Sequence, residues 1–142
     1  MLVSQILRVK GDAVFTATPQ ETIGAICALL HSRRVGAMVV MDGDRVVGIV
    51  SERDVIRVLA EAGAEALTRP VSSCMTHDVL FATPSETVDS LLARMTDRRV
   101  RHLPVCRDER LIGIVSIGDL VKHKISEVEA EADGLKAYIS AS

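Results

Sequence analysis

An internal repeat constrains the fold of this chain more than any other feature, because its second half matches its first at a constant offset of 65 residues. The segment Gly48-Ile49-Val50-Ser51 aligns with Gly113-Ile114-Val115-Ser116, and the register holds without a gap over residues 14–57 of the first copy. A turn, an apolar strand and an Asp keep one frame in both copies, which indicates a duplicated unit. A unit of about 45 residues is marginally stable alone, so we expect the two copies to pack face to face as one pseudo-twofold domain.

Each copy is predicted to follow the order β-α-β-β-α, which gives a mixed α/β (α+β) fold. The duplicated unit is preceded by a predicted amphipathic helix over residues 2–9. The first copy is expected to contain an extended segment over 13–17, a helix with Thr18 at the N-cap, Pro19 at N1 and Glu21 at N3 that runs to about Ser32, a strand over 36–41, a turn at 42–44, a strand over 45–50 and a helix from Ser51 to about Gly63.

A Ser followed three residues later by an Asp begins the last helix of each copy. Ser51 and Ser116 occupy the expected N-cap positions, and Asp54 and Asp119 lie in the first turn. The pattern is typical of a capping box, in which Ser caps the N3 amide and the acid reaches back to the N-cap amide. It also fits a ligand site, because a carboxylate accepts hydrogen bonds from a cis-diol and a helix N-terminus favours a phosphate. The residues alone leave both interpretations open.

Composition argues against a nucleic-acid partner. The 142 residues are 48% hydrophobic but only 2% aromatic, and the net charge is −2. The core must therefore be built from aliphatic side chains and methionine. Neither a basic footprint for phosphates nor an aromatic platform for stacked bases is present in this composition.

The sequence also lacks the patterns typical of enzymes and of exported proteins. The N-terminal apolar run is too short for a membrane span and lacks the layout of a signal peptide, so a cytoplasmic protein without a membrane partner is expected. Cys27, Cys74 and Cys106 have no metal-ligand spacing and are expected to be free buried thiols. No nucleophile elbow or glycine-rich phosphate loop occurs, so neither catalysis nor a metal or required cofactor is expected.

The C-terminal residues 126–142 are rich in acids and are expected to extend the last helix. Gly134 interrupts this segment. Two interpretations stay open: a helical tail that packs back on the domain, or a helix that binds a second copy or another partner. The tail carries a sparse apolar stripe formed by Ile125, Val128, Leu135, Tyr138 and Ile139.

These motifs resemble a tandem pair of CBS domains, also called a Bateman module. The resemblance rests on GIVSERDV and GIVSIGDL, on TPQET and TPSET, and on RRVGAMVV and RRVRHLPV before the hairpins. It covers roughly residues 8–125 and is greatest to small stand-alone CBS-pair proteins. It implies CBS repeat 1 at 8–66, CBS repeat 2 at 71–126 and a C-terminal helical tail at 127–142.

The resemblance carries expectations of architecture and function. It implies two β-α-β-β-α CBS repeats related by pseudo-twofold symmetry, with N- and C-terminal helical extensions. The family often forms homodimers that assemble into a disc of four repeats. Its members bind AMP, ADP or ATP, and sometimes S-adenosylmethionine or NAD, in clefts between repeats.

The same resemblance assigns roles to individual residues. Asp119 and Asp54 match the ribose-binding aspartates, and Ser116 and Ser51 match their hydroxyl partners. Each implied cleft draws on both repeats. The cleft of Asp119 is implied to be lined by Thr18, Ile23, Val100, Arg101, His102, Leu103 and Pro104. The cleft of Asp54 is implied to be lined by Thr83, Val88, Val35, Gly36, Ala37 and Met38.

The two implied clefts differ in charge. Arg101 and His102 stand where the other cleft has Gly36 and Ala37. A guanidinium binds phosphate bidentately and His adds a donor, so the first cleft is expected to bind a phosphorylated adenosine better. Without the resemblance, these two residues are interpreted as plain surface residues on a strand edge.

Two further cations are candidate ligands of the phosphate, and two functions follow from the whole pattern. Arg53 is expected to reach a shared phosphate, and Lys10 is a weaker candidate.

The first function is a regulatory module that binds an adenine nucleotide and signals to an unknown protein partner through a change in geometry. The alternative is a dimeric scaffold that binds no nucleotide, in which the Ser-x-x-Asp boxes are only helix caps.

Overall fold

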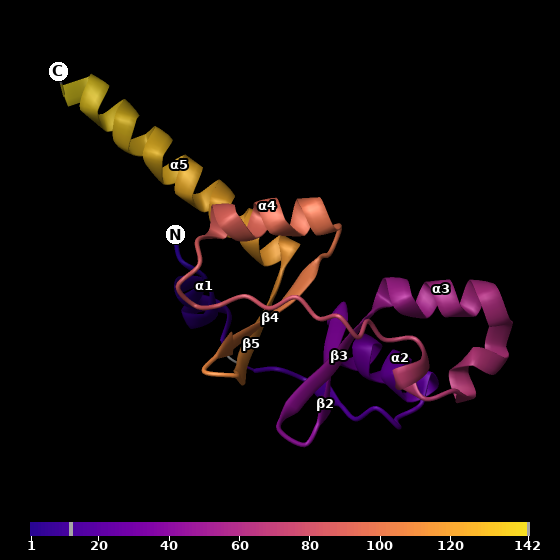
Figure 1. Cartoon of the computed structure of the whole chain (residues 1–142). Helices are drawn as coiled ribbons and strands as arrows, with labels where there is room; N and C mark the ends of the chain where they lie inside the picture. The colour runs from indigo at the N-terminus through magenta and orange to yellow at the C-terminus, as the bar shows by residue number, and fades with distance from the viewer. Residues whose placement is uncertain (12, 142) are drawn as a thin grey trace. The chain divides into compact units, whose positions relative to one another are not determined.

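The computed structural model describes residues 1–11 and 13–141 (Figure 1). Asp12, inside the expected first repeat, and Ser142, inside the expected tail, fall outside the described residues. The elements in chain order are α1 (Val3–Lys10), β1 (Thr16–Ala17), α2 (Ile23–Arg33), β2 (Ala37–Asp42), β3 (Arg45–Ser51), α3 (Glu52–Ala62), the 3₁₀ helices η1 (Gly63–Thr68) and η2 (Val71–Ser73), α4 (Val88–Arg98), β4 (His102–Arg107), β5 (Arg110–Ser116) and α5 (Ile117–Ala141).

The predicted repeat is confirmed, although an isolated bridge replaces the first strand in the second copy. In the first copy β1 pairs parallel with β2, placing Ala17 beside Val40, and β2 pairs antiparallel with β3. In the second copy β4 pairs with β5, and an isolated parallel bridge places Ala82 beside Val105. Both copies therefore fold to the same order of elements.

The start predicted for the first helix of each repeat is wrong. Helix α2 begins at Ile23, and the Oγ1 atom of Thr22 accepts its capping hydrogen bond from the amide of Ala25 at 3.1 Å. Thr18, predicted as the N-cap, instead begins a turn in which its carbonyl accepts the Glu21 amide at 3.2 Å. The second repeat behaves alike, with Thr83 in a turn and Thr87 capping α4.

Backbone hydrogen bonds from another segment explain why these turns do not join the helices. The Pro19 and Glu21 carbonyls accept the amides of Ser72 and Val71 at 3.1 and 2.7 Å. In a helix that began at Thr18 the Ile23 amide would donate to the Pro19 carbonyl, but it donates to the Arg69 carbonyl at 2.9 Å instead. The second turn is held similarly, since the carbonyls of residues 84 and 86 accept the first amides of α1 at 3.0 and 2.9 Å.

The chain folds into two compact units, and each contains the leading segment of the other repeat. One unit comprises Met1–Asp12, Phe81–Arg107 and Gly113–Ser142, so α1 packs with the elements of the second repeat. The other comprises Ala13–Leu80 and Asp108–Ile112, so η1 and η2 pack with the elements of the first repeat. We call these the second-repeat unit and the first-repeat unit.

A glycine in the last strand of each repeat lets the leading segment of the other repeat approach closely. A Cβ atom on Gly48 would lie 2.5 Å from Sδ of Met75, and one on Gly113 would lie 2.6 Å from Cδ2 of Leu7. The carbonyl oxygen of Thr76 would lie 3.0 Å from the same Cβ atom on Gly48. Thr76 is fixed there by two hydrogen bonds with Ile49.

Gly48→Ala is expected to lower the free energy of unfolding by about 1–3 kcal/mol, because the added methyl group overpacks this contact. Gly113→Ala is the matched control and should cost less, since only the flexible end of Leu7 must move. Urea unfolding of both variants measures the difference. Equal losses would contradict the role given to the Thr76 backbone.

The core is aliphatic, as the composition predicts. Its largest fully buried side chains include Ile26, Met38, Leu91, Met95 and Leu103. The cysteines are free, with Cys74 buried and Cys27 and Cys106 half-buried. Burial raises the pKa of all three thiols, which keeps them protonated and weakly nucleophilic at neutral pH. None of the helices in the described part of the chain has the length and apolar character needed to cross a bilayer.

Helix α5 runs unbroken through the predicted interruption at Gly134. A single glycine costs a helix interior only about 1 kcal/mol, which neighbouring helix formers such as Ala and Leu offset. Residues 128–141 are exposed throughout, so the interpretation of a tail that packs back on the domain is wrong for this part of α5. In Figure 1 the yellow end of α5 extends beyond α4.

Candidate functional site

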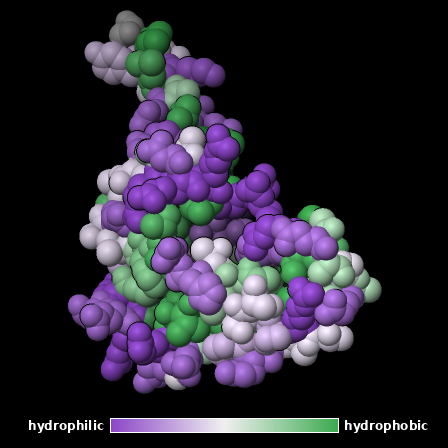
Figure 2. Space-filling model, turned by 45° about the vertical axis from the view of Figure 1, so that its right-hand side comes forward, coloured by the Kyte–Doolittle hydropathy of each residue, from purple (hydrophilic) through white to green (hydrophobic). Residues whose placement is uncertain are grey.

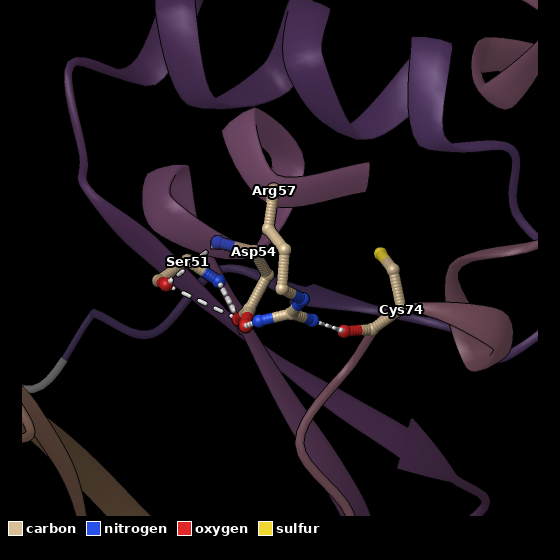
Figure 3. Close-up of polar contacts among 4 residues, drawn as sticks. All are labelled: Ser51, Asp54, Arg57 and Cys74. Atoms are coloured by element: carbon tan, nitrogen blue, oxygen red, sulfur yellow. Dashed lines mark hydrogen bonds and ion pairs between the residues drawn. The ribbon is translucent and has the colours of Figure 1, made fainter. Parts of the chain in front are cut away.

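The Ser-x-x-Asp box of the first repeat is a closed hydrogen-bond network (Figure 3). The Oδ2 atom of Asp54 accepts the Ser51 amide at 2.9 Å and the Ser51 hydroxyl at 3.1 Å. The Oδ1 atom accepts Nη1 of Arg57 at 3.0 Å, and Nη2 of the same Arg57 donates to the Cys74 carbonyl at 3.0 Å. Asp54 is 7% exposed, and both of its carboxylate oxygens are engaged.

The corresponding box of the second repeat is more open. The Oδ2 atom of Asp119 accepts the Ser116 amide at 2.9 Å and Nζ of Lys10 at 2.7 Å. The Asp119 amide donates to the Ser116 hydroxyl at 3.1 Å. Among the described residues, no hydrogen bond reaches Oδ1 of Asp119, and its side chain is 27% exposed. This oxygen is thus available to a ligand, unlike either oxygen of Asp54.

Lys10 occupies its position because α1 packs with the second repeat. Its ammonium also donates to the Ile114 carbonyl at 2.8 Å, so it is held by two acceptors. At the offset of 65 residues, Lys10 aligns with Met75, which contacts Gly48 in the first-repeat unit. The position that supplies a cation to the second box therefore holds a thioether in the first-repeat unit, where the cation beside the box is Arg57 of α3 itself.

The ionisation of Asp119 is set by competing effects. Burial alone raises the pKa of its carboxyl group, but the hydrogen bonds from Lys10 and Ser116, together with the Lys10 charge, outweigh burial and hold the pKa below its usual value. Asp119 is consequently a carboxylate at neutral pH. An ionised carboxylate is the form that accepts hydrogen bonds from a diol.

Lys10→Met, which installs the residue of the aligned position, should raise the pKa of Asp119 because burial then acts with less opposition. In the wild type, the depressed pKa contributes stability above the unfolded-state pKa near 4, and this stability is lost as the pH falls through the folded-state pKa. Urea unfolding between acidic and neutral pH should show a smaller rise in stability for the variant. An unchanged pH profile would show that Lys10 does not influence Asp119.

Several predicted site residues lie in the same unit as Asp119. The carbonyl of Arg101 accepts the Ile117 amide at 2.8 Å, so the start of β4 lies against the N-terminus of α5. Arg101 is exposed and His102 is half-buried. Leu103 is 1% exposed and belongs to the core. Val100 and Pro104, which are also predicted to line the cleft of Asp119, lie in this unit as well.

The first-repeat unit has an equivalent arrangement around Asp54. The carbonyl of Gly36 accepts the Glu52 amide at 3.0 Å, which places the start of β2 against the N-terminus of α3. Arg53 is exposed, whereas Ala37 and Met38 are 6% and 1% exposed. Val35 precedes this strand and is half-buried.

The remaining predicted lining residues belong to the opposite unit in each case. Thr18 and Ile23 lie in the unit of Asp54, and Thr83 and Val88 lie in the unit of Asp119. Their participation in the cleft of the other repeat stays a prediction. Ile23 and Val88 are 0% and 2% exposed, so these side chains contribute to the core.

Reasoning from sequence missed the ion pair of Arg57 with Asp54 and the packing of α1 and η2 with the elements of the other repeat. A signal was present, because Val3-Ser4 and Val71-Ser72 repeat the same dipeptide ahead of the two repeats. Glycine inside a strand is also a sign of close approach by another segment. No group of three or more His, Cys, Asp or Glu residues in the described chain is placed to hold a metal ion.

These features define a chain built from two copies of one α/β unit, and sequence comparison gives the family. The CBS domain model matches residues 5–61 and 71–126. The chain therefore belongs to the CBS domain family and carries two CBS domains in tandem.

Individual relatives and solved structures agree with this assignment. The mitochondrial CBS domain-containing protein CBSX3 of Arabidopsis thaliana is 32% identical, over 96% of this chain and 71% of the relative. The crystal structure of the CBS-domain protein ATU1752 from Agrobacterium tumefaciens is 41% identical, with a TM-score of 0.86 over 87% of this chain and 99% of that one.

Other solved structures of the same fold contain adenosine compounds. The CBS domain pair of protein MJ0100, in complex with 5-methylthioadenosine and S-adenosyl-L-methionine, is 24% identical with a TM-score of 0.80, over 89% of this chain and 98% of that one. The CBS protein PAE2072 from Pyrobaculum aerophilum, complexed with AMP, is 24% identical with a TM-score of 0.74, over 84% and 89%. These likenesses establish the shared fold.

Proposed function

We propose that this chain is a non-catalytic regulatory module that binds an adenosine nucleotide at Asp119 and passes the binding event to a protein partner in the cytoplasm. The observation that carries the proposal is the available Oδ1 atom of the ionised Asp119, which lies in the first turn of a 25-residue helix. Ribose hydroxyls would donate to this oxygen. The adenosine ligands of MJ0100 and PAE2072 support the choice of ligand class.

The surroundings of Asp119 favour a ligand with a phosphate. The N-terminus of α5 offers partial positive charge. Arg101 lies beside it, because the Arg101 carbonyl accepts the first amide of α5. S-adenosylmethionine carries a cationic sulfonium, and its one anionic group is the carboxylate of its methionine part, so it would gain less from Arg101 than a phosphate would. We therefore rank AMP, ADP, ATP and NAD above S-adenosylmethionine.

A thermal-unfolding panel tests this ranking. Wild-type protein is heated with AMP, ADP, ATP, NAD, S-adenosylmethionine or adenosine, because a ligand that binds only the folded state raises the melting temperature. The expected result is a concentration-dependent shift with the phosphorylated compounds. No shift with any of them would favour the scaffold alternative, which the exposed apolar residues of α5 support.

Arg101→Ala is expected to weaken AMP binding about tenfold to a hundredfold while changing adenosine binding little, because a charged hydrogen bond to phosphate contributes about 1.5–3 kcal/mol. Arg107→Ala is the matched control, an exposed Arg at the far end of β4, the strand that Arg101 immediately precedes. Calorimetric titration with both ligands separates the phosphate term from the ribose term. Equal losses for AMP and adenosine would contradict a phosphate contact.

A further inference from the structure

The exposed face of α5 has the spacing of a coiled-coil seam. Its apolar side chains are separated alternately by four and three residues, which is the heptad pattern of a helix that pairs with another helix. Five of them are large and 42–63% exposed, and Ala132 is also exposed. We call this set the α5 stripe; it comprises Val121, Ile125, Val128, Ala132, Leu135 and Ile139.

The α5 stripe faces away from the side of α5 that packs on the unit. The inward face of α5 carries the buried Leu120, together with Lys124, whose Nζ lies 3.0 Å from Oδ1 of Asp89 in α4. Glu127 on the same side lies 3.8 Å from the N-terminal ammonium group. Residues three, four and seven apart share one face of a helix, and the stripe is displaced from that of Leu120 by one residue, about 100° around the helix. In Figure 2 apolar side chains lie among polar ones along the projecting helix.

The residues that flank the stripe carry charges that fit a second copy of the same helix. In a parallel in-register pair, a g position of one helix lies beside the e position five residues later in the other. Those neighbours would be Lys124 with Glu129 and Glu131 with Lys136. Both combinations are opposite in charge, but Lys124 already pairs with Asp89 of α4. The combination of Glu131 with Lys136 therefore carries the argument, and symmetry produces it twice.

The residues inside the stripe favour the same arrangement. The a positions are Ile125, Ala132 and Ile139, and the d positions are Val121, Val128 and Leu135. Two β-branched a residues and a Leu at d match the preference of two-stranded parallel coiled coils over residues 125–139. Gly134 lies at a c position, away from the seam. Within the described chain, neither Glu131 nor Lys136 has an ion-pair partner, so both are available to a second copy.

We propose that α5 binds α5 of a second copy of this chain as a parallel, in-register coiled coil over residues 121–139. The inference concerns a surface apart from Asp119 and does not depend on nucleotide binding. It commits to a second copy rather than a different protein because the flanking combination of Glu131 with Lys136 is self-complementary.

Disulfide trapping of the full chain tests the geometry. Leu135→Cys places a thiol on the seam, where two in-register copies bring residue 135 against itself, and Ala130→Cys places one on the opposite face. Air oxidation should produce a covalent dimer for Leu135→Cys, but not for Ala130→Cys or for the wild type with its three native cysteines. Equal trapping at both positions would overturn the proposal. Efficient trapping only in a mixture of Ile125→Cys with Leu135→Cys would overturn the parallel orientation.

Charge reversal gives an independent readout in the Leu135→Cys background. Glu131→Lys or Lys136→Glu alone should lower the trapped fraction, with association weakened about tenfold by two repulsive pairs. Mixing the two single variants restores opposite charges at both sites and should restore trapping. Unchanged trapping in the single variants, or no recovery in the mixture, would overturn the assigned contacts.

Discussion

Asp119→Ala is expected to weaken AMP binding by at least about a hundredfold, the largest effect on ligand binding of any single change considered. The ribose hydroxyls lose a charged acceptor, and hydrogen bonds to charged groups contribute about 1.5–3 kcal/mol each. The ammonium of Lys10 also loses its partner 2.7 Å away, leaving a cation with one backbone acceptor at the site.

Asp54→Ala is the matched control for binding, because it removes the same residue from the same motif in the other repeat. Both oxygens of Asp54 are already satisfied by Ser51 and Arg57, so its loss should leave AMP binding at the Asp119 site within a few-fold of wild type. Equal loss of binding in both variants would contradict the assignment of the primary site to Asp119.

Asp54→Ala is expected to produce the larger loss of stability, about 2–3 kcal/mol in the free energy of unfolding. The change removes the carboxylate that completes the capping box of α3 and breaks the ion pair between the buried Asp54 and Arg57, which in turn donates to the Cys74 carbonyl. Caps contribute about 1 kcal/mol, and removing one partner of a buried pair costs more than the pair contributes. Arg57 is 54% exposed, which moderates the second term.

Urea unfolding of the two alanine variants measures this difference. Asp119→Ala should cost less, since its carboxylate is more exposed and Lys10 can turn to water. Arg57→Ala should reproduce part of the Asp54→Ala loss, because it breaks the same pair from the other side. A larger loss for Asp119→Ala than for Asp54→Ala would contradict the structural role of the first box.

The sequence repeat predicted the elements well because it is carried by local signals. The glycine-containing strands, the turn at Gly43 and the Ser-x-x-Asp helix starts depend on nearby residues, and the structure has all of them. The left-handed residues Arg34 and Arg99, both with φ of 54°, end the first helix of each repeat at the same aligned position.

The errors concern contacts between segments distant in the sequence. Thr18 has every local feature of an N-cap, but the carbonyls that follow it bind the amides of Val71 and Ser72. The placement of Lys10 beside Asp119 likewise depends on α1 packing with the second repeat, which no local pattern around Lys10 encodes. The difference between the two boxes was expected from Arg101 and His102, whereas the structure adds a second cause in the partners of each carboxylate.

The account is tested most directly by calorimetric titration of AMP into the wild type and into Asp119→Ala under identical conditions. It predicts saturable binding by the wild type and none measurable by the variant, which should remain folded by circular dichroism. Binding of equal affinity in both proteins, or no binding in either, would contradict the claim that Asp119 forms a nucleotide site.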